Sequence, residues 1–188
     1  MMIQIVKTTT LWTLLILFTV SCSSEPTEQS AETGDRPDVE QRIAELGIEL
    51  TEPSPPTANF VRTVRTGNLI FLSGHGPDLP GGGRVIGKVG GDLTVEEGQE
   101  AARLAGISLL SSLKAEIGDL NRVKRIVKAT GMVNAPGDFT QHSQVINGFS
   151  DLMVEIFGER GSHARAAVGM SSLPFNMAVE IEIVVEVE

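Results

Sequence analysis

Residues 163–188 read HARAAVGMSSLPFNMAVEIEIVVEVE and contain two apolar segments joined by a turn at Leu173-Pro174. The second segment alternates between apolar and mostly acidic positions. One side of it carries Val179, Ile181, Ile183, Val185 and Val187, and the other carries Glu180, Glu182, Val184, Glu186 and Glu188. A period of two residues predicts a strand that buries one face and leaves the other in solvent.

The first segment holds one charge, Arg165, among alanines and valine. A guanidinium in confined apolar surroundings needs an anion, which the protein or a ligand can supply. Arg165 is therefore a candidate binding residue. The alternative is a structural ion pair with Glu180 or Glu182 across a subunit contact.

Two amphipathic helices precede this region. Thr94 and Glu97 form a capping box, and Gly118 ends the first helix. Asp138 is the expected N-cap of the second helix, which Gly158 closes. The apolar stripes are Ala101, Ala105, Leu109 and Leu113 in the first helix and Val145, Phe149, Leu152 and Ile156 in the second.

Strands are expected at residues 60–66 and 69–73, joined by a hairpin turn at Gly67-Asn68, and at residues 122–133. The glycine-rich residues 80–91 predict a loop around a short strand at 84–89, and they lack a phosphate-binding motif. Two helices on one face of a mixed sheet give an α+β sandwich. The other sheet face, which carries Glu180 and Glu182, is then left for self-association.

The start of the chain differs in composition from this body. Residues 11–20 form a short apolar run after Lys7, which is typical of a signal peptide rather than a membrane span. Cys22, the only cysteine, follows as in a bacterial lipobox, so residues 1–21 are expected to be removed and Cys22 lipidated. The protein would then be exported to the periplasmic face of a membrane, or secreted if Cys22 is incidental.

Residues 22–38 are rich in Ser, Glu, Thr and Pro and predict a flexible tether. A short helix with Val39, Ile43 and Leu46 and a proline-rich lead-in follow over residues 39–57, and the folded domain takes residues 58–188. Without residues 1–21 the chain keeps 14 basic and 24 acidic residues, because only Lys7 is lost, and 14 − 24 gives −10. Such a charge disfavours nucleic acid as a partner.

The two blocks TGNLIFLSGHGP and ARAAVG–LP–VEIEIVVEV, in this order, resemble the Rid family (YjgF/YER057c/UK114). The resemblance covers residues 58–188 and implies a chorismate mutase-like fold and homotrimers with sites in the clefts between subunits. It also implies hydrolysis of 2-imino acids to 2-oxo acids and ammonia, without metal or other cofactor.

The resemblance assigns roles residue by residue. Arg165 and the backbone N–H of Ala167 would bind the substrate carboxylate, and Glu180 would orient the attacking water and relay protons. The pocket would be lined by Ser73, Gly74, Phe60 and Asn147. His75, next to Gly74, is a candidate proton donor, although a histidine in such a loop more often faces solvent.

Several departures indicate a divergent subgroup. Phe60 stands where active deaminases typically carry a tyrosine, and Ala167 stands where cysteine is frequent. The second helix carries about three additional residues, near residues 141–144. A non-catalytic trimeric binder of small carboxylic acids at the cell envelope therefore remains the alternative function.

Cys22→Ala should release the protein from the membrane fraction without changing its fold, because the substitution removes the only candidate lipid attachment site. Fractionation of cells expressing each form, with mass spectrometry of the mature N-terminus, tests this. A wild-type protein that is already soluble and does not begin at Cys22 would contradict lipidation.

Overall fold

The computed structural model describes residues 38–56 and 58–188. The expected signal peptide, Cys22 and all but the last residue of the expected tether lie outside the described residues. Within the described part, no helix is long and apolar enough to cross a membrane.

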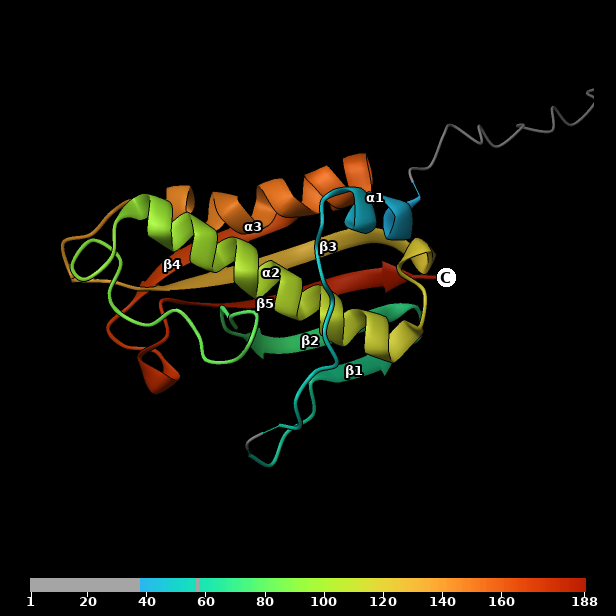
Figure 1. Cartoon of the computed structure of the whole chain (residues 1–188), viewed down its shortest axis with the longest axis horizontal. Helices are drawn as coiled ribbons and strands as arrows, with labels where there is room; N and C mark the ends of the chain where they lie inside the picture. The colour runs from blue at the N-terminus through green and yellow to red at the C-terminus, as the bar shows by residue number, and fades with distance from the viewer. Residues whose placement is uncertain (1–37, 57) are drawn as a thin grey trace, which may run out of the picture. The chain divides into compact units, whose positions relative to one another are not determined.

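The core of the structure is a five-stranded sheet in the order β1-β2-β5-β3-β4 (Figure 1). Neighbouring strands are antiparallel except β3 and β4, which are parallel. The strands span Thr63–Thr66 (β1), Leu69–His75 (β2), Val123–Asn134 (β3), Ala164–Met170 (β4) and Val179–Val187 (β5). The mixed sheet confirms the predicted α+β class.

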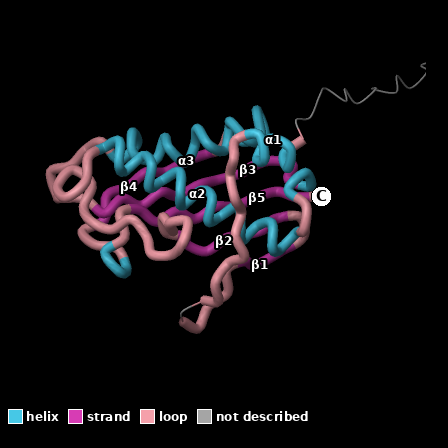
Figure 2. Tube along the Cα trace, viewed as in Figure 1, coloured by secondary structure: helices cyan, strands magenta, loops and turns pink. Residues whose placement is uncertain are grey.

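Three helices pack on one face of this sheet, as the tube in Figure 2 shows. The helix α2 (Val95–Ile117) crosses the sheet beside α3 (His142–Phe157), and the short α1 (Val39–Glu45) lies against α3. Single 3₁₀ turns η1, η2 and η3 occupy Leu120–Arg122, Gly158–Gly161 and Pro174–Asn176. The opposite sheet face has no covering element among the described residues.

The predicted start of α2 is confirmed in detail. The backbone N–H of Glu97 donates to Thr94 Oγ1 at 3.1 Å, and the N–H of Thr94 donates to Glu97 Oε2 at 2.8 Å. Gly118 ends the helix with φ of 78°, a conformation that costs glycine little. These caps satisfy backbone groups that a helix end otherwise leaves unpaired.

The predicted start of α3 is wrong. Asp138 does not cap it; Gln141 holds the N-cap position, with no side-chain hydrogen bond there. The reason is a turn before the helix, closed by the Phe139 N–H donating to the Pro136 carbonyl at 3.1 Å. The chain therefore reaches the helical conformation three residues later than the capping pattern suggested.

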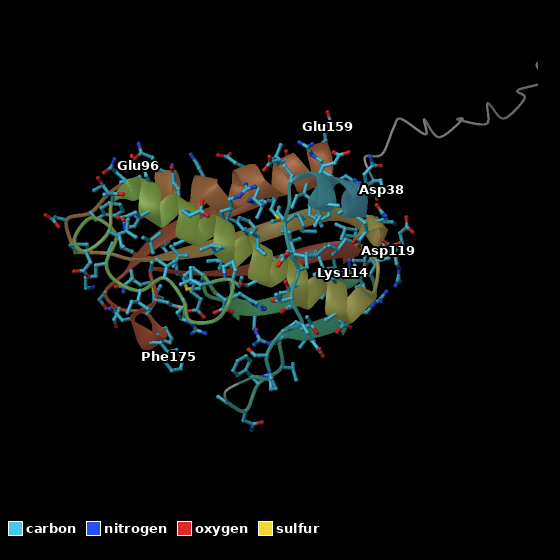
Figure 3. All side chains as sticks on the ribbon, in the orientation of Figure 1. Asp38, Glu96, Lys114, Asp119, Glu159 and Phe175 are labelled. Carbon is cyan, nitrogen blue, oxygen red and sulfur yellow. The ribbon has the colours of Figure 1, made fainter. Side chains whose placement is uncertain are left out.

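The predicted short strand at residues 84–89 is also wrong. The segment makes only isolated bridges, such as Ile86 with Met177, because positive φ values at Gly87 (118°) and Gly90 (87°) interrupt an extended backbone. The first hairpin strand likewise begins at Thr63 rather than at residue 60. The turn after β4 is confirmed, and its exposed Phe175 projects from the surface (Figure 3).

The alternation of β5 is confirmed by burial. Its apolar set of Val179, Ile181, Ile183, Val185 and Val187 is buried beneath the helices. β5 pairs with both β2 and β3, so it lies at the centre of the sheet. Leu109, Leu113, Phe149, Leu152 and Ile156 from the two predicted stripes complete the same core.

The two long helices approach closely at Gly148. A Cβ placed there would lie 2.0 Å from the backbone oxygen of Gln99 in α2, a distance that neither backbone can accommodate without moving. The contact fixes how near α3 lies to α2 and to the sheet beneath.

Gly148→Ala should therefore destabilise the protein, although alanine ordinarily favours a helix over glycine. Overpacking of this kind costs about 1–3 kcal/mol, which chemical denaturation can measure. The matched control is Gly137→Ala, where a Cβ meets nothing within 4 Å and φ is not positive. Equal stability of the two variants would contradict the close helix contact.

Candidate functional site

Arg165 lies on the helix-covered side of the sheet, at its β4 edge. It pairs with Ala129 of β3, which in turn pairs with the buried Ile183 of β5. Its guanidinium reaches α3, where Nη1 donates to Asn147 Oδ1 at 3.0 Å and to Ser150 Oγ at 2.9 Å. Asn147, which the resemblance places near the pocket, is thus in direct contact with Arg165.

The partners of Arg165 are all uncharged. Besides Asn147 and Ser150, Nη2 donates to the carbonyl of Ser143 at 3.3 Å. Among the described residues no carboxylate forms an ion pair with Arg165. The guanidinium is therefore held in one orientation, and no carboxylate of the described residues compensates its charge.

Sequence reasoning missed Ser143 and Ser150. Together with Asn147 they stand at positions i, i+4 and i+7 of one helix, so they form a polar stripe on the side of α3 that faces β4. This spacing was present in the sequence beside the apolar stripe. It gave no signal by itself, because only the fold brings Arg165 against that side of the helix.

His163, to which no role had been assigned, orients this cluster. Its Nδ1 lies 2.7 Å from the carbonyl of Gly161, which can only accept, so Nδ1 carries the proton and Nε2 accepts from the Ser150 hydroxyl at 3.1 Å. Burial lowers the pKa of His163, and the charge of Arg165 lowers it further against the Gly161 hydrogen bond. A neutral His163 directs the Ser150 hydroxyl proton away from Arg165, leaving its oxygen to accept.

Glu180 projects from the opposite, uncovered face, since its neighbours Val179 and Ile181 point into the core. Its carboxylate rests on Gly74: a Cβ at Gly74 would lie 2.0 Å from Glu180 Oε1. Burial raises the pKa of Glu180, and the nearby charge of Glu182 raises it further. A carboxyl group with a raised pKa is a candidate for proton transfer.

Ser73 and Gly74 form a bulge in β2, where the pairing with β5 shifts between Leu72 and His75. The bulge leaves Gly74 beneath the Glu180 carboxylate. Ser73 Oγ is buried, and within the described chain it has no hydrogen-bond partner. An unsatisfied hydroxyl beside Gly74 is a polar group that a ligand or a second subunit can satisfy.

Phe60 and Ala167 occupy different surroundings. Phe60 lies just before β1 and is half exposed. Ala167, two residues after Arg165, shares its side of β4 and packs partly against the core. β4 is an edge strand that pairs only with β3, so its outer edge presents unpaired backbone groups.

The predicted site residues thus fall into two groups. Arg165, Ala167 and Asn147 lie at the β4 edge on the helix side, whereas Ser73, Gly74 and Glu180 lie on the uncovered face. β4 and β5 are separated by β3, which places the groups roughly 10 Å apart laterally in addition to the thickness of the sheet. One chain does not bring the two groups into a single pocket.

His75 does not face solvent, contrary to the expectation for a loop histidine. It ends β2 with 3% of its surface exposed and points to the helix side, away from Glu180. Its Nε2 lies 2.7 Å from Ser112 Oγ of α2. Over the described ranges, no group of three or more His, Cys, Asp and Glu side chains is placed to hold a metal ion.

The pKa of Glu180 predicts a pH-dependent stability. A raised pKa means that the folded state binds this proton more tightly than the unfolded state, so its stabilising contribution is complete below about pH 4.3, the ordinary glutamate value. The contribution is lost as the pH rises through the raised folded pKa. Glu180→Gln should therefore be more stable than the wild type at neutral pH, and the difference should shrink towards acid pH.

Thermal unfolding of both proteins between pH 4 and pH 8 measures this, with the exposed Glu159→Gln as the control for removing one acid. The control should change the melting temperature little at any pH. A Glu180→Gln variant that is less stable than the wild type at neutral pH would show that the folded chain favours the carboxylate.

Comparison with known proteins shows a family match and similar solved structures. Residues 40–187 match the family described as "YjgF/chorismate mutase-like, putative endoribonuclease". Protein TCP17 of Trypanosoma cruzi is 44% identical over 149 residues, which cover 79% of this chain and 93% of that protein. A solved structure of a protein of unknown function from Agrobacterium tumefaciens is 42% identical with a TM-score of 0.74, and covers 80% of this chain and 94% of that one.

A second solved structure, of a putative endoribonuclease from Shewanella oneidensis MR-1, is 32% identical with a TM-score of 0.77 and covers 80% of this chain and all of that one. The match extends over nearly the whole described body. The five-stranded mixed sheet with its helices on one face is the chorismate mutase-like fold that the resemblance predicted. The chain therefore belongs to the YjgF/chorismate mutase-like family.

Proposed function

We propose that the protein hydrolyses 2-imino or enamino acids to 2-oxo acids and ammonia, at a site shared between subunits of a homotrimer. The observation that carries the proposal is Arg165. Three neutral acceptors fix its guanidinium at an open sheet edge, and no carboxylate of the described chain neutralises it. Such a group is arranged to receive an anion from outside the chain.

A substrate carboxylate fits this position. It would accept from the guanidinium of Arg165 and from the backbone N–H of Ala167, on the same side of β4. The edge position of β4 supports this role, because a neighbouring subunit can close over a strand edge and exclude water from the charge pair. The imine carbon, next to the bound carboxylate, would then be held in a defined place.

Glu180 supplies proton transfer in this proposal. A water molecule adds through its oxygen to the imine carbon, and Glu180 takes one of its protons and delivers it to the nitrogen. The hydroxyl proton of the resulting carbinolamine then passes through Glu180 to the nitrogen, and the C–N bond breaks as the C=O bond forms. One water is consumed, ammonia leaves, and no redox partner is needed. A carboxyl group whose pKa is raised by burial is matched to both halves of this transfer.

Association into a homotrimer would bring together the Arg165 and Glu180 groups, which lie apart in one chain. The uncovered sheet face carries exposed apolar side chains from several strands, namely Val64, Phe71, Val168 and Met170. Association of copies would remove this surface from water. It would also allow the Arg165 group of one subunit to meet the Glu180 group of the next, which a single chain cannot do.

A second candidate function is non-catalytic binding of small carboxylic acids. Phe60 favours it, because a phenyl ring at the pocket position supplies no hydroxyl to the reaction. The export expected from residues 1–22 would also favour it, since cytoplasmic enzymes are the main source of reactive imines. Ribonuclease activity is less compatible with a chain of 24 acidic and 15 basic residues, since phosphate backbones are bound by cationic surfaces.

Substitutions at the two groups separate enzyme from binder. Arg165→Ala removes a charge-assisted contact, which costs about 2–3 kcal/mol or roughly 30- to 160-fold in kcat/KM, with loss of measurable 2-oxobutanoate binding. Glu180→Gln should keep binding and lose about 10²- to 10⁴-fold in turnover. The assays are semicarbazide trapping of 2-iminobutanoate generated in situ and calorimetry with 2-oxobutanoate.

Mixed oligomers test whether the site is shared. Light scattering should give a trimer mass, and co-assembled Arg165→Ala and Glu180→Gln subunits should recover part of the activity that each variant lacks alone. Binding that depends on Arg165 without any wild-type turnover would support the binder instead. A stable monomer, or variants that change neither assay, would refute the shared site.

A further inference from the structure

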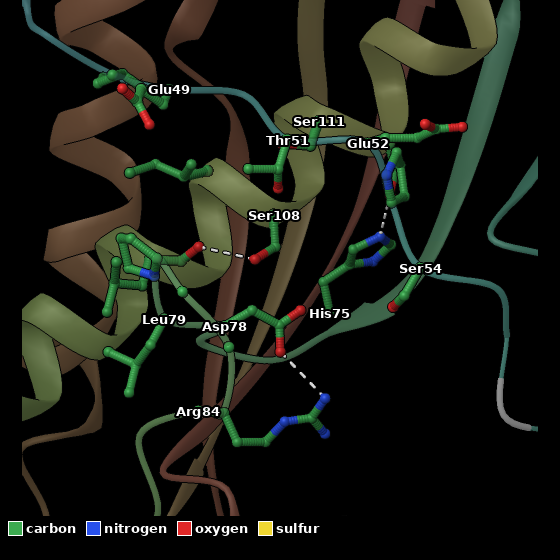
Figure 4. Close-up of a pocket in the computed structure, with 18 of the residues that line it drawn as sticks. Glu49, Thr51, Glu52, Ser54, His75, Asp78, Leu79, Arg84, Ser108 and Ser111 are labelled. Carbon is green, nitrogen blue, oxygen red and sulfur yellow. Dashed lines mark hydrogen bonds and ion pairs between the residues drawn. The ribbon is translucent and has the colours of Figure 1, made fainter.

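A cavity lies on the helix side of the sheet, away from the Arg165 and Glu180 groups. Its volume is about 630 Å³, within the range of pockets that hold small organic molecules. Residues 47–54, which cross the outer surface of α2, form one wall, and residues 78–84 form another (Figure 4). The floor is the outer side of α2, with His75 and Arg62 at the end nearest β2.

Arg62 is the cation at that end of the cavity, which the carboxylate of Asp78 also lines. Its Nε donates to the Ser54 carbonyl at 2.8 Å and its Nη2 to Ser54 Oγ at 3.2 Å, while Nη1 approaches His75 Nε2 at 3.5 Å. In the described chain no carboxylate pairs with Arg62. A guanidinium has five N–H donors, and these contacts use three, which leaves two for a ligand.

His75 cannot neutralise or replace this charge. Its Nδ1 lies 2.7 Å from the carbonyl of Ser73, so Nδ1 carries the proton and Nε2 accepts from Ser112 and Arg62. Burial in the core lowers the pKa of His75, in keeping with the neutral form. At this end of the cavity, hydrogen bonds to Ser54 and His75 therefore hold the positively charged Arg62 guanidinium in place.

The rest of the cavity favours an apolar body over a second negative charge. Leu104 and Ile107 of α2 and Ile48 of the crossing segment line it. Arg84, the other cation, is already paired with Asp78 at 3.1 Å. The exposed side chains of Glu49 and Glu52 stand at the rim, where they repel multiply charged anions.

We propose that this cavity is a second ligand site, which binds a small organic monocarboxylate with its carboxylate on Arg62 and its aliphatic or aromatic body against α2. It is independent of the Arg165 and Glu180 groups, which lie at the β4 edge and on the uncovered face. The competing role for Arg62 is structural, since its bonds to Ser54 also hold residues 47–54 against the body.

The test is an NMR titration of the ¹⁵N-labelled full chain, following backbone amides of residues 78–84 and 104–112. Hexanoate should shift these signals. Hexanamide lacks the charge, acetate lacks the apolar body, and inorganic phosphate lacks that body and carries more than one charge near neutral pH, so each should bind at least about ten-fold more weakly. Arg62→Gln should weaken hexanoate binding at least about ten-fold, and Arg62→Lys less so.

Matched variants separate ligand binding from structure. Arg65→Gln removes a cation of β1, three residues after Arg62, and should leave hexanoate binding unchanged, as should Arg165→Gln at the other site. Ser54→Ala removes one neutral anchor of the Arg62 guanidinium and should weaken hexanoate binding less than Arg62→Gln does. Equal binding of hexanoate and hexanamide, or unchanged hexanoate binding in Arg62→Gln, would overturn the proposal. If Arg62→Gln fails to fold, the comparison of hexanoate with hexanamide on the wild-type protein decides the question.

Discussion

β5 carries one buried and one uncovered face, and the remainder of the structure depends on that difference. Its valines and isoleucines must be removed from water, which requires α2 and α3 on one side and β2 and β3 on either edge. Each buried aliphatic side chain of this kind contributes about 1.5–3 kcal/mol. The same alternation forces the glutamates to the other face, where Glu180 is half-buried against Gly74.

This division explains why the candidate catalytic groups do not meet within one chain. Arg165 lies on the helix side because it pairs with Ala129, which faces the core and pairs in turn with the buried Ile183. Glu180 belongs to the alternate set on β5 and lies on the uncovered face. An edge strand with an oriented cation and a sheet face with an acid are complementary surfaces, and the exposed apolar side chains beside them favour association.

Two arginines share an unusual environment for so acidic a chain. Arg84 and Arg103 pair with carboxylates at 3.1 and 3.0 Å, as surface arginines commonly do. Arg62 and Arg165 are instead held by serine, asparagine and carbonyl oxygens, and each lies next to a histidine held in one tautomer by a carbonyl. Neutral anchors orient a guanidinium without cancelling its charge, which is the arrangement that anion recognition requires.

Secondary-structure elements that depend on neighbouring residues could be predicted from the sequence. The period of β5, the Thr94 capping box and the terminal Gly118 and Gly158 depend on neighbouring residues only, and the structure confirms them. Local signals failed at Asp138 and at residues 84–89, where a turn and positive φ values override the pattern. The resemblance expected Asn147 near the same pocket as Arg165, and in the structure the two side chains are hydrogen-bonded.

The strand order, the parallel pairing of β3 with β4, and the faces on which the Arg165 and Glu180 groups lie could not be predicted from the sequence and follow from tertiary packing. Strand order depends on contacts between segments far apart in the chain, which alternation within one strand does not encode. For the same reason Ser150, His163 and the Arg62 cavity gave no sequence signal. Their chemistry arises from side chains that approach one another only after the helices have packed on the sheet.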